Sequence, residues 1–295
     1  MSKQTIFRGA ATALITPLNA KGVDFEALGR LIDWQIAQGI DALVIAGTTG
    51  EGATLTYDEH QEVIRFSVER AAGRVPIIAG SGSNDTNRAV TLSRFSCDAG
   101  ADALLVVTPY YNKATQKGLI AMYNTIADAV DKPIILYNVP SRTGGGIEPN
   151  TYLALAEHPN IVGIKEANGN ISKIVETARL VGDKLDIYSG NDDQVVPILA
   201  MGGSGVISVL SNVMPAQTHA MCERFFKGDL AGAAKLQMNY LPLINALFSE
   251  VNPIPVKAAM AAMGWCENYL RMPLTRMEPE HWEKLKTIMQ AHGLI

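Results

Sequence analysis

The sequence has few cysteines, little charge and no long hydrophobic run. Its three cysteines, Cys97, Cys222 and Cys266, are widely separated, which excludes a disulfide framework or a CxxC metal knuckle and favours reduced core thiols. Only 18% of the residues are charged, and a net charge of −4 gives no basic field to attract nucleic acid or anionic lipid. No stretch reaches the roughly 18 apolar residues of a membrane-spanning helix, and we find no signal peptide. We therefore expect a cytoplasmic protein without nucleic-acid or membrane partners.

Apolar residues are abundant, at 47% of the 295 residues, and they fall in short runs. Eight runs are rich in β-branched and aliphatic residues: 10–15, 42–46, 75–79, 103–107, 134–137, 161–165, 185–188 and 205–209. Their spacing fits a strand followed by a helix, which predicts an α/β fold with a parallel sheet covered by helices. Eight such units are the number that closes a (β/α)8, or TIM, barrel. An open doubly wound sheet stays as the alternative.

Helix signals fill the gaps between the predicted strands. Asp24 is placed to cap a helix that follows it. Thr56 and Glu59 have the spacing of a capping box, and Gly73 is a stop signal for that second helix. The pattern therefore predicts amphipathic helices between consecutive strands.

After the eighth predicted strand the pattern is helical only. Helices are expected over 216–226, 230–248, 255–263 and 281–291. The Gly228–Asp229 pair predicts a boundary between a catalytic barrel, 1–228, and a C-terminal helical domain, 229–295. We expect this helical appendage to serve packing or assembly.

Lys165 is the most informative candidate for catalysis. It ends the sixth predicted strand after the apolar run 161–164, where a charge is expected only if the amine faces a cavity. A lysine amine becomes nucleophilic when burial disfavours its charged form, and it can then form a Schiff base with a carbonyl. The alternative is a strand-end lysine that pairs with a carboxylate such as Glu166.

Hydroxyl side chains follow neighbouring strands. Tyr111 and Tyr137 bring two phenols to the same end of the barrel, and the Thr48 and Thr49 hydroxyls can link them in a proton relay. The small residues of 47–50 can turn main-chain N–H groups inward to cradle a substrate carboxylate, with a plain tight turn as the alternative.

Arg142 lies between Pro140 and Gly144, in a loop where its guanidinium can bind a second carboxylate through two hydrogen bonds. A surface arginine is the alternative. The five histidines show no metal-ligand spacing, and the glycine-rich segments 80–82 and 202–205 lack the order of a nucleotide-binding loop. We expect no metal site and no nucleotide.

At these positions the chain resembles the dihydrodipicolinate synthase and N-acetylneuraminate lyase family of class I aldolase-type lyases. The resemblance runs from residue 9 to 295 and is carried by GTTGE (47–51), TPYYN (108–112), YNVPSRTG (137–144), GIKEA (163–167), GVISV (205–209) and NPIPVKAAM (252–260). Segments 141–143 and 252–257 resemble the synthase branch more than the sialic acid lyase branch.

The resemblance implies that Lys165 forms an imine with pyruvate and that no other cofactor is needed. The derived enamine would add to L-aspartate 4-semialdehyde and give 4-hydroxy-tetrahydrodipicolinate, the first committed step of the diaminopimelate route to lysine. The implied catalytic residues are Lys165, Tyr137, Thr48 and Tyr111, and the implied substrate-binding residues are Thr49, Arg142, Gly190 and Ile207. Two alternatives stay open: a pyruvate-dependent aldolase acting on a sugar acid or another 2-oxo acid, and a non-catalytic barrel used for binding or assembly.

The resemblance also implies a homo-oligomer, a tetramer built from tight dimers in which Tyr111 completes the neighbouring subunit's relay. A lysine feedback site often lies at that dimer interface in the synthase branch, and three residues match it: His60, Asn84 and Tyr110. Three others depart from it: Arg88, Gly52 and Tyr57. A cationic ligand beside Arg88 would be repelled, so we expect weak or absent inhibition by lysine.

Overall fold

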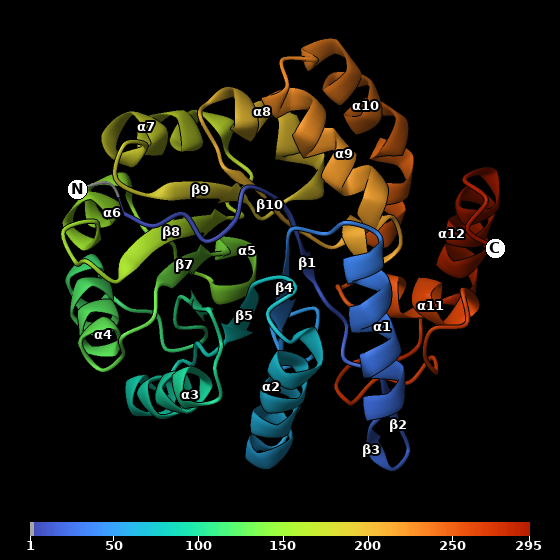
Figure 1. Ribbon diagram of the computed structural model, residues 1–295, viewed down its shortest axis with the longest axis horizontal. Helices are drawn as coiled ribbons and strands as arrows, with labels where there is room; N and C mark the ends of the chain where they lie inside the picture. The colour runs from blue at the N-terminus through green and yellow to red at the C-terminus, as the bar shows by residue number, and fades with distance from the viewer. Residues whose placement is uncertain (1–2) are drawn as a thin grey trace.

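Parallel strands close into a barrel at the centre of the molecule (Figure 1). The computed structural model describes residues 3–295, and in that range the barrel strands are β1 (Gly9–Ala13), β4 (Ala42–Ile45), β5 (Ile77–Gly80), β6 (Ala103–Val107), β7 (Ile134–Asn138), β8 (Ile161–Glu166), β9 (Asp186–Ser189) and β10 (Gly205–Ser208). They pair in the order β1-β10-β9-β8-β7-β6-β5-β4, and β4 pairs with β1. The predicted TIM barrel is confirmed, and the open-sheet alternative is wrong.

Helices surround the barrel (Figure 1). They are α1 (Phe25–Ala37), α2 (Tyr57–Ala71), α3 (Thr86–Asp98), α4 (Gln116–Asp128), α6 (Pro149–Leu155), α7 (Ile171–Val181), α8 (Val195–Ala200) and α9 (Pro215–Phe226). The predicted start signals are confirmed, because Asp24 accepts a hydrogen bond from the N–H of Ala27 and the Thr56–Glu59 capping box is complete. α2 ends at Ala71, two residues before the predicted stop.

Among the elements within residues 3–295, two short strands and a short α-helix were not predicted from the sequence. The strands β2 (Leu18–Asn19) and β3 (Gly22–Val23) form a small antiparallel pair, and helix α5 (Pro140–Thr143) follows β7 directly. Each has fewer residues than the period of an apolar pattern needs to show itself. α5 matters for function because it carries Arg142.

Side-chain alternation along the strands divides the core into two layers. Val44, Ile78 and Leu105 point into the barrel and pack in one cluster with Tyr137 and Ile207. The side chains that alternate with them form a larger cluster with the surrounding helices. The packed interior of the barrel therefore reaches the level of the candidate catalytic residues.

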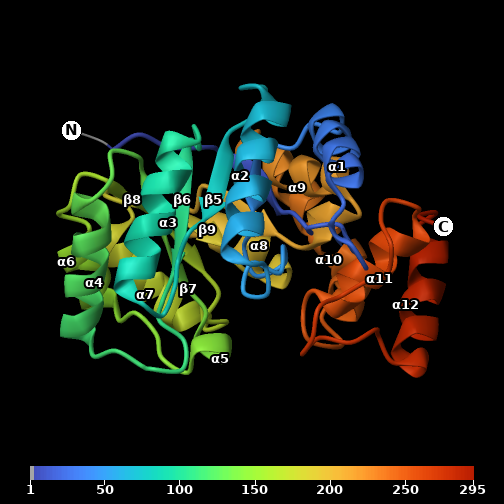
Figure 2. The ribbon, with the colours of Figure 1, turned by 90° about the horizontal axis from the view of Figure 1, so that it is seen from below.

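The C-terminal helices are α10 (Leu230–Leu247), α11 (Ile254–Ala262) and α12 (Pro279–Ala291), so the helices expected after the barrel are confirmed with small shifts at their ends. Figure 2 shows α11 and α12 on one side of the barrel, next to α10. The proposed boundary at 228/229 falls in the link between α9 and α10, and the division into two domains stays a prediction.

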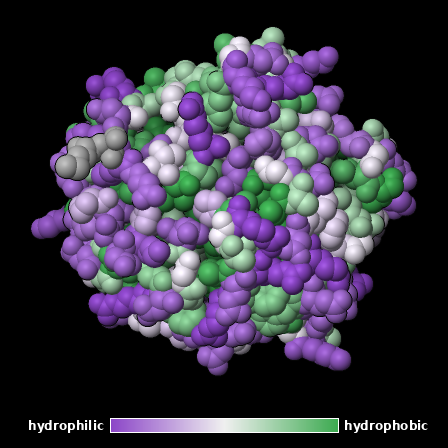
Figure 3. Space-filling model, viewed as in Figure 1, coloured by the Kyte–Doolittle hydropathy of each residue, from purple (hydrophilic) through white to green (hydrophobic). Residues whose placement is uncertain are grey.

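The visible surface is mixed in character. Figure 3 shows hydrophilic side chains over most of one face, with small hydrophobic patches between them. Within residues 3–295 no helix is both long and apolar enough to cross a membrane.

Candidate active site

Tyr137 and Lys165 lie opposite each other on the neighbouring strands β7 and β8. The Lys165 Nζ atom is 4.3 Å from the centroid of the Tyr137 ring. Both side chains are nearly buried, with exposed fractions of 6% for Lys165 and 7% for Tyr137. The structure therefore brings the predicted nucleophile and the predicted proton carrier into contact.

Glu166 points away from the barrel interior, because successive strand residues face opposite sides. Its carboxylate accepts hydrogen bonds from the side-chain amide of Asn138 (2.9 Å), the Tyr152 hydroxyl (2.8 Å) and the main-chain N–H of Asn168 (2.9 Å). Burial raises the pKa of Glu166 to about 7, although these hydrogen bonds oppose the shift. The alternative in which Lys165 pairs with Glu166 is therefore wrong.

The loop after β4 folds into a turn that carries Thr48 and Thr49. The N–H of Glu51 donates to the Thr48 carbonyl (3.1 Å), and the N–H of Gly52 donates to the Gly47 carbonyl (3.1 Å). A Cβ atom at Gly52 would lie 2.1 Å from the carbonyl oxygen of Ala46, so only glycine fits there. The turn uses these two amides internally, so a carboxylate cradle in this loop has to use the amides that precede them.

Arg142 reaches across the barrel mouth from α5. Its Nη2 donates to the main-chain carbonyl of Asn252 (3.0 Å), and the side-chain amide of Asn252 donates to Thr49 Oγ1 (3.0 Å). Asn252 Oδ1 is buried and has no hydrogen-bond partner within the described residues. Asn252 thus joins both candidate carboxylate-binding side chains. The sequence analysis gave Asn252 no individual role. The only feature of the sequence that pointed to it was its place in the NPIPVKAAM motif.

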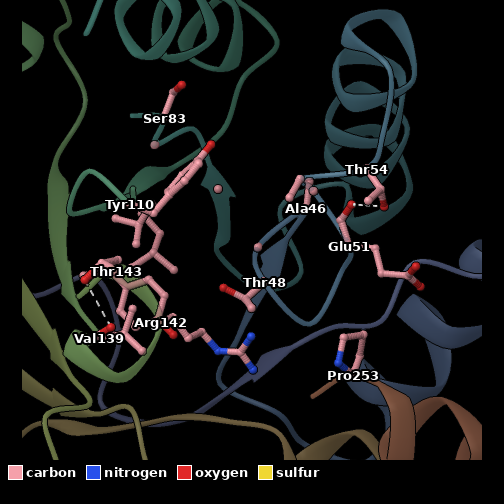
Figure 4. A pocket seen from close by; sticks show the side chains of 18 of the residues that line it. Ala46, Thr48, Glu51, Thr54, Ser83, Tyr110, Val139, Arg142, Thr143 and Pro253 are labelled. Carbon is pink, nitrogen blue, oxygen red and sulfur yellow. Dashed lines mark hydrogen bonds between the residues drawn. The ribbon is translucent and has the colours of Figure 1, made fainter. Parts of the chain in front are cut away.

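A cavity of about 400 Å³ opens at this end of the barrel. Of the predicted catalytic and substrate-binding residues, Thr48, Tyr137 and Arg142 line it, and Figure 4 shows Thr48 and Arg142 projecting toward each other. Lys165 is not part of the cavity wall, but its amine lies 4.3 Å from the ring centroid of Tyr137, which is. A cavity of this volume is large enough for two small organic acids.

Gly190 directly follows β9, and Ile207 lies within β10. The N–H of Gly190 donates to the Glu166 carbonyl (2.7 Å), and a Cβ atom at this position would lie 2.7 Å from that of Ala167. Ile207 is fully buried in the cluster that contains Tyr137. Neither residue is part of the cavity wall that Thr48 and Arg142 form.

Tyr111 stands apart from the other candidates. Its side chain is 93% exposed and its φ is 70°, a left-handed conformation that non-glycine residues rarely adopt. The loop is held by Asn84, which donates to the Tyr110 carbonyl (3.2 Å) and accepts from the Asn112 side chain (2.9 Å). Within the described chain, the Tyr111 phenol therefore faces outward and does not line the cavity with Tyr137.

Most of the residues of the predicted regulatory pattern line the same cavity. His60, Tyr110, Gly52 and Arg88 line it. His60 is buried, and its Nε2 lies 2.8 Å from the Gly80 carbonyl. Burial lowers the pKa of His60, and the Arg88 guanidinium adds to this shift, so the imidazole is neutral at pH 7 and Arg88 is the charged group there.

Comparison with known proteins agrees with this geometry. The profile of the dihydrodipicolinate synthetase family matches residues 6–292. A 4-hydroxy-tetrahydrodipicolinate synthase from Thermoanaerobacter sp. (strain X514) is 52% identical over 291 residues, covering 98% of each chain. The same enzyme from Lachnoclostridium phytofermentans is 54% identical over 292 residues, covering 98% of this chain and 99% of its own. The crystal structure of dihydrodipicolinate synthase from Aquifex aeolicus superposes with a TM-score of 0.96 at 45% identity, covering 98% of this chain and 99% of that one. The chain belongs to the dihydrodipicolinate synthetase family.

Proposed function

We propose that this chain catalyses the condensation of pyruvate with L-aspartate 4-semialdehyde to 4-hydroxy-tetrahydrodipicolinate, the first committed step of the diaminopimelate route to lysine. It is a lyase of the Schiff-base class. The observation that carries the proposal is the position of the Lys165 amine, 4.3 Å from the Tyr137 ring centroid beside a cavity of about 400 Å³. Relatives with this activity at 50–54% identity support it.

Lys165 supplies the nucleophile. Its neutral amine attacks C2 of pyruvate, and the carbonyl oxygen leaves as water when the imine forms. Loss of a proton from the methyl carbon then gives an enamine, and this carbon forms a bond to the aldehyde carbon of the second substrate. The amino group of that substrate attacks the imine carbon, closes the ring and releases the lysine amine. The reaction needs no cofactor besides the lysine itself.

We assign proton transfer at the imine to Tyr137, whose ring centroid lies 4.3 Å from the Lys165 amine. Thr48 links Tyr137 to a second phenol, Tyr111. Because Tyr111 is 93% exposed in its own chain, we propose that it serves the relay of a neighbouring subunit in a tight dimer, and that two dimers form a tetramer.

Substrate carboxylates bind at the mouth of the barrel. We assign the pyruvate carboxylate to Thr49 and the turn around it, and the semialdehyde carboxylate to the Arg142 guanidinium. The resemblance to the family assigns Gly190, which follows β9, and Ile207, in β10, to substrate binding, although neither lines the cavity. We propose that the enzyme acts in the cytoplasm.

Borohydride reduction in the presence of pyruvate tests the covalent step. The expected result is a stable adduct on the peptide that contains Lys165, detected by mass spectrometry. Absence of an adduct would leave a binding or assembly role for the barrel. A panel of aldehyde acceptors then separates the condensation from aldol chemistry on a sugar acid, and only the semialdehyde should give efficient turnover.

A further inference from the structure

A buried ion pair joins helix α11 to the loop after β4. Lys257 Nζ donates to Glu51 Oε1 at 2.5 Å, and both side chains are fully buried. The same ammonium donates to the Thr16 carbonyl at 2.7 Å, and Glu51 Oε2 accepts from the main-chain N–H of Arg271 at 3.1 Å. Four segments that are distant in sequence, around residues 16, 51, 257 and 271, therefore meet at this ion pair.

The backbone at Glu51 depends on its surroundings. Its φ is 53°, a left-handed conformation that a non-glycine residue keeps only when neighbouring groups hold it. The Glu51 N–H closes the turn onto the Thr48 carbonyl, and the Thr16 hydroxyl donates to the Gly50 carbonyl at 2.7 Å. Fixing Glu51 therefore fixes the turn that holds the Thr48 and Thr49 hydroxyls.

Stability alone does not account for a buried ion pair at this position. Burial lowers the pKa of Lys257, while the Glu51 carboxylate opposes that shift. The cost of removing both charges from water offsets most of their attraction, and apolar residues of similar size often stabilise a core equally well. Its location one turn from the candidate catalytic hydroxyls indicates a geometric role instead.

A second contact from the same part of the chain reaches the turn. Asn252, just before α11, donates to the Thr49 hydroxyl at 3.0 Å. The Lys257 main-chain N–H donates to the carbonyl of Pro253, so the ion pair and Asn252 belong to one continuous hydrogen-bonded segment. This segment holds the turn at Thr49 and at Glu51.

We propose that Lys257 and Glu51 are positioning residues of the condensation reaction, which hold the 48–51 turn so that the Thr48 and Thr49 hydroxyls face the pyruvate imine on Lys165. The inference rests on the proposed function and deepens it. It gives the C-terminal helical segment a part in the active site, because Lys257 on α11 acts there through Glu51, a residue of the cavity wall.

The double variant Lys257→Met with Glu51→Met tests this role, because it removes the ion pair without leaving one buried charge unpaired. We expect the pyruvate KM to rise and kcat to fall, together lowering kcat/KM by roughly 10- to 100-fold. Glu51→Gln retains the side-chain shape and an acceptor for Lys257, so it should fold and show a smaller change in the same direction.

Met260→Ala is the matched control. Met260 is fully buried on the same helix, so this variant loses thermal stability while the ion pair stays in place, and its pyruvate KM should equal that of the unmodified enzyme. If the double variant or Glu51→Gln has unchanged kcat and KM, the positioning role is overturned. If the unmodified enzyme forms no adduct with pyruvate under borohydride, the proposed function itself fails, and this inference fails with it.

Discussion

The main-chain carbonyl of Asn252 accepts a hydrogen bond of 3.0 Å from Arg142, a residue 110 positions earlier in the chain. Through its side chain, Asn252 also bonds to Thr49. The two proposed carboxylate-binding residues are therefore coupled through a residue of the C-terminal segment, and only one of the two contacts depends on the side chain.

This difference gives a prediction for Asn252→Ala. The variant loses the hydrogen bond to Thr49 but retains the carbonyl that holds Arg142. Loss of one buried hydrogen bond corresponds to about a tenfold change in affinity, so the pyruvate KM should rise about tenfold while the semialdehyde KM changes much less. Steady-state kinetics with each substrate varied in turn will measure both. Asn245→Ala, the same substitution at an exposed position of α10 that does not line the cavity, is the control and should change neither KM markedly.

Replacement of Lys165 by methionine should remove the chemistry and leave the fold intact. The side chain keeps a similar length but has no amine, so kcat should fall by at least about 1000-fold and the borohydride adduct should disappear. Lys173→Met is the matched control, because Lys173 is an exposed lysine that bonds to Glu148 on the protein surface. Turnover in Lys165→Met close to that of the control would contradict the proposed mechanism.

Glu166 should make stability depend on pH. Its pKa in the folded protein is raised to about 7 from an ordinary value of 4.5, so the folded state holds a proton that the unfolded state has released between these pH values. The contribution to stability is fully present below about pH 4.5 and is lost as the pH rises through about 7. The shift corresponds to about 3 kcal/mol in the free energy of unfolding.

The test compares the enzyme with Glu166→Gln, which cannot titrate. Denaturant unfolding at pH 5, 6, 7 and 8 should show the stability of the unmodified enzyme declining relative to the variant as pH rises. A difference in the free energy of unfolding that is the same at every pH does not test the raised pKa, because the glutamine amide must also fit beside the Tyr152 hydroxyl. Glu148→Gln, at an exposed position, retains Glu166, so its stability should decline with pH in parallel with that of the unmodified enzyme. Parallel stability curves for the enzyme and Glu166→Gln would refute the raised pKa.

Local patterns predicted the barrel and the identity of the main reactive residue, because both depend on short segments. The eight strands were visible as apolar runs, and Lys165 was visible as a charge at the end of one of them. What the sequence could not show were contacts between distant segments. Asn252, Lys257 and Glu51 meet near the barrel mouth only after the C-terminal helices have folded back, and no spacing rule connects positions about 200 residues apart.

The direction of the Tyr111 side chain could not be predicted from the sequence either. The sequence placed its phenol at the same end of the barrel as Tyr137, and that follows from topology. Its outward direction depends on the left-handed backbone at Tyr111 and on the hydrogen bonds of Asn84, neither of which an apolar pattern encodes.

Arg88 gives a prediction about regulation. Arg88 and His60 line the same cavity. The lowered pKa of His60 leaves its imidazole neutral at pH 7, so the fixed charge beside it is the positive charge of Arg88. A cationic effector such as lysine is repelled by this guanidinium. The enzyme should therefore retain most of its activity in millimolar lysine.

Reversal of this charge should create sensitivity. In Arg88→Glu the side chain attracts the ligand ammonium, and half-inhibition should occur at a lysine concentration at least about tenfold lower than in the unmodified enzyme. Arg94→Glu is the control on the same helix, because Arg94 is exposed and bonds to the Ala129 carbonyl instead of lining this cavity. Activity assays over a lysine titration distinguish the three proteins. Strong inhibition of the unmodified enzyme by millimolar lysine would show that repulsion by Arg88 does not control binding.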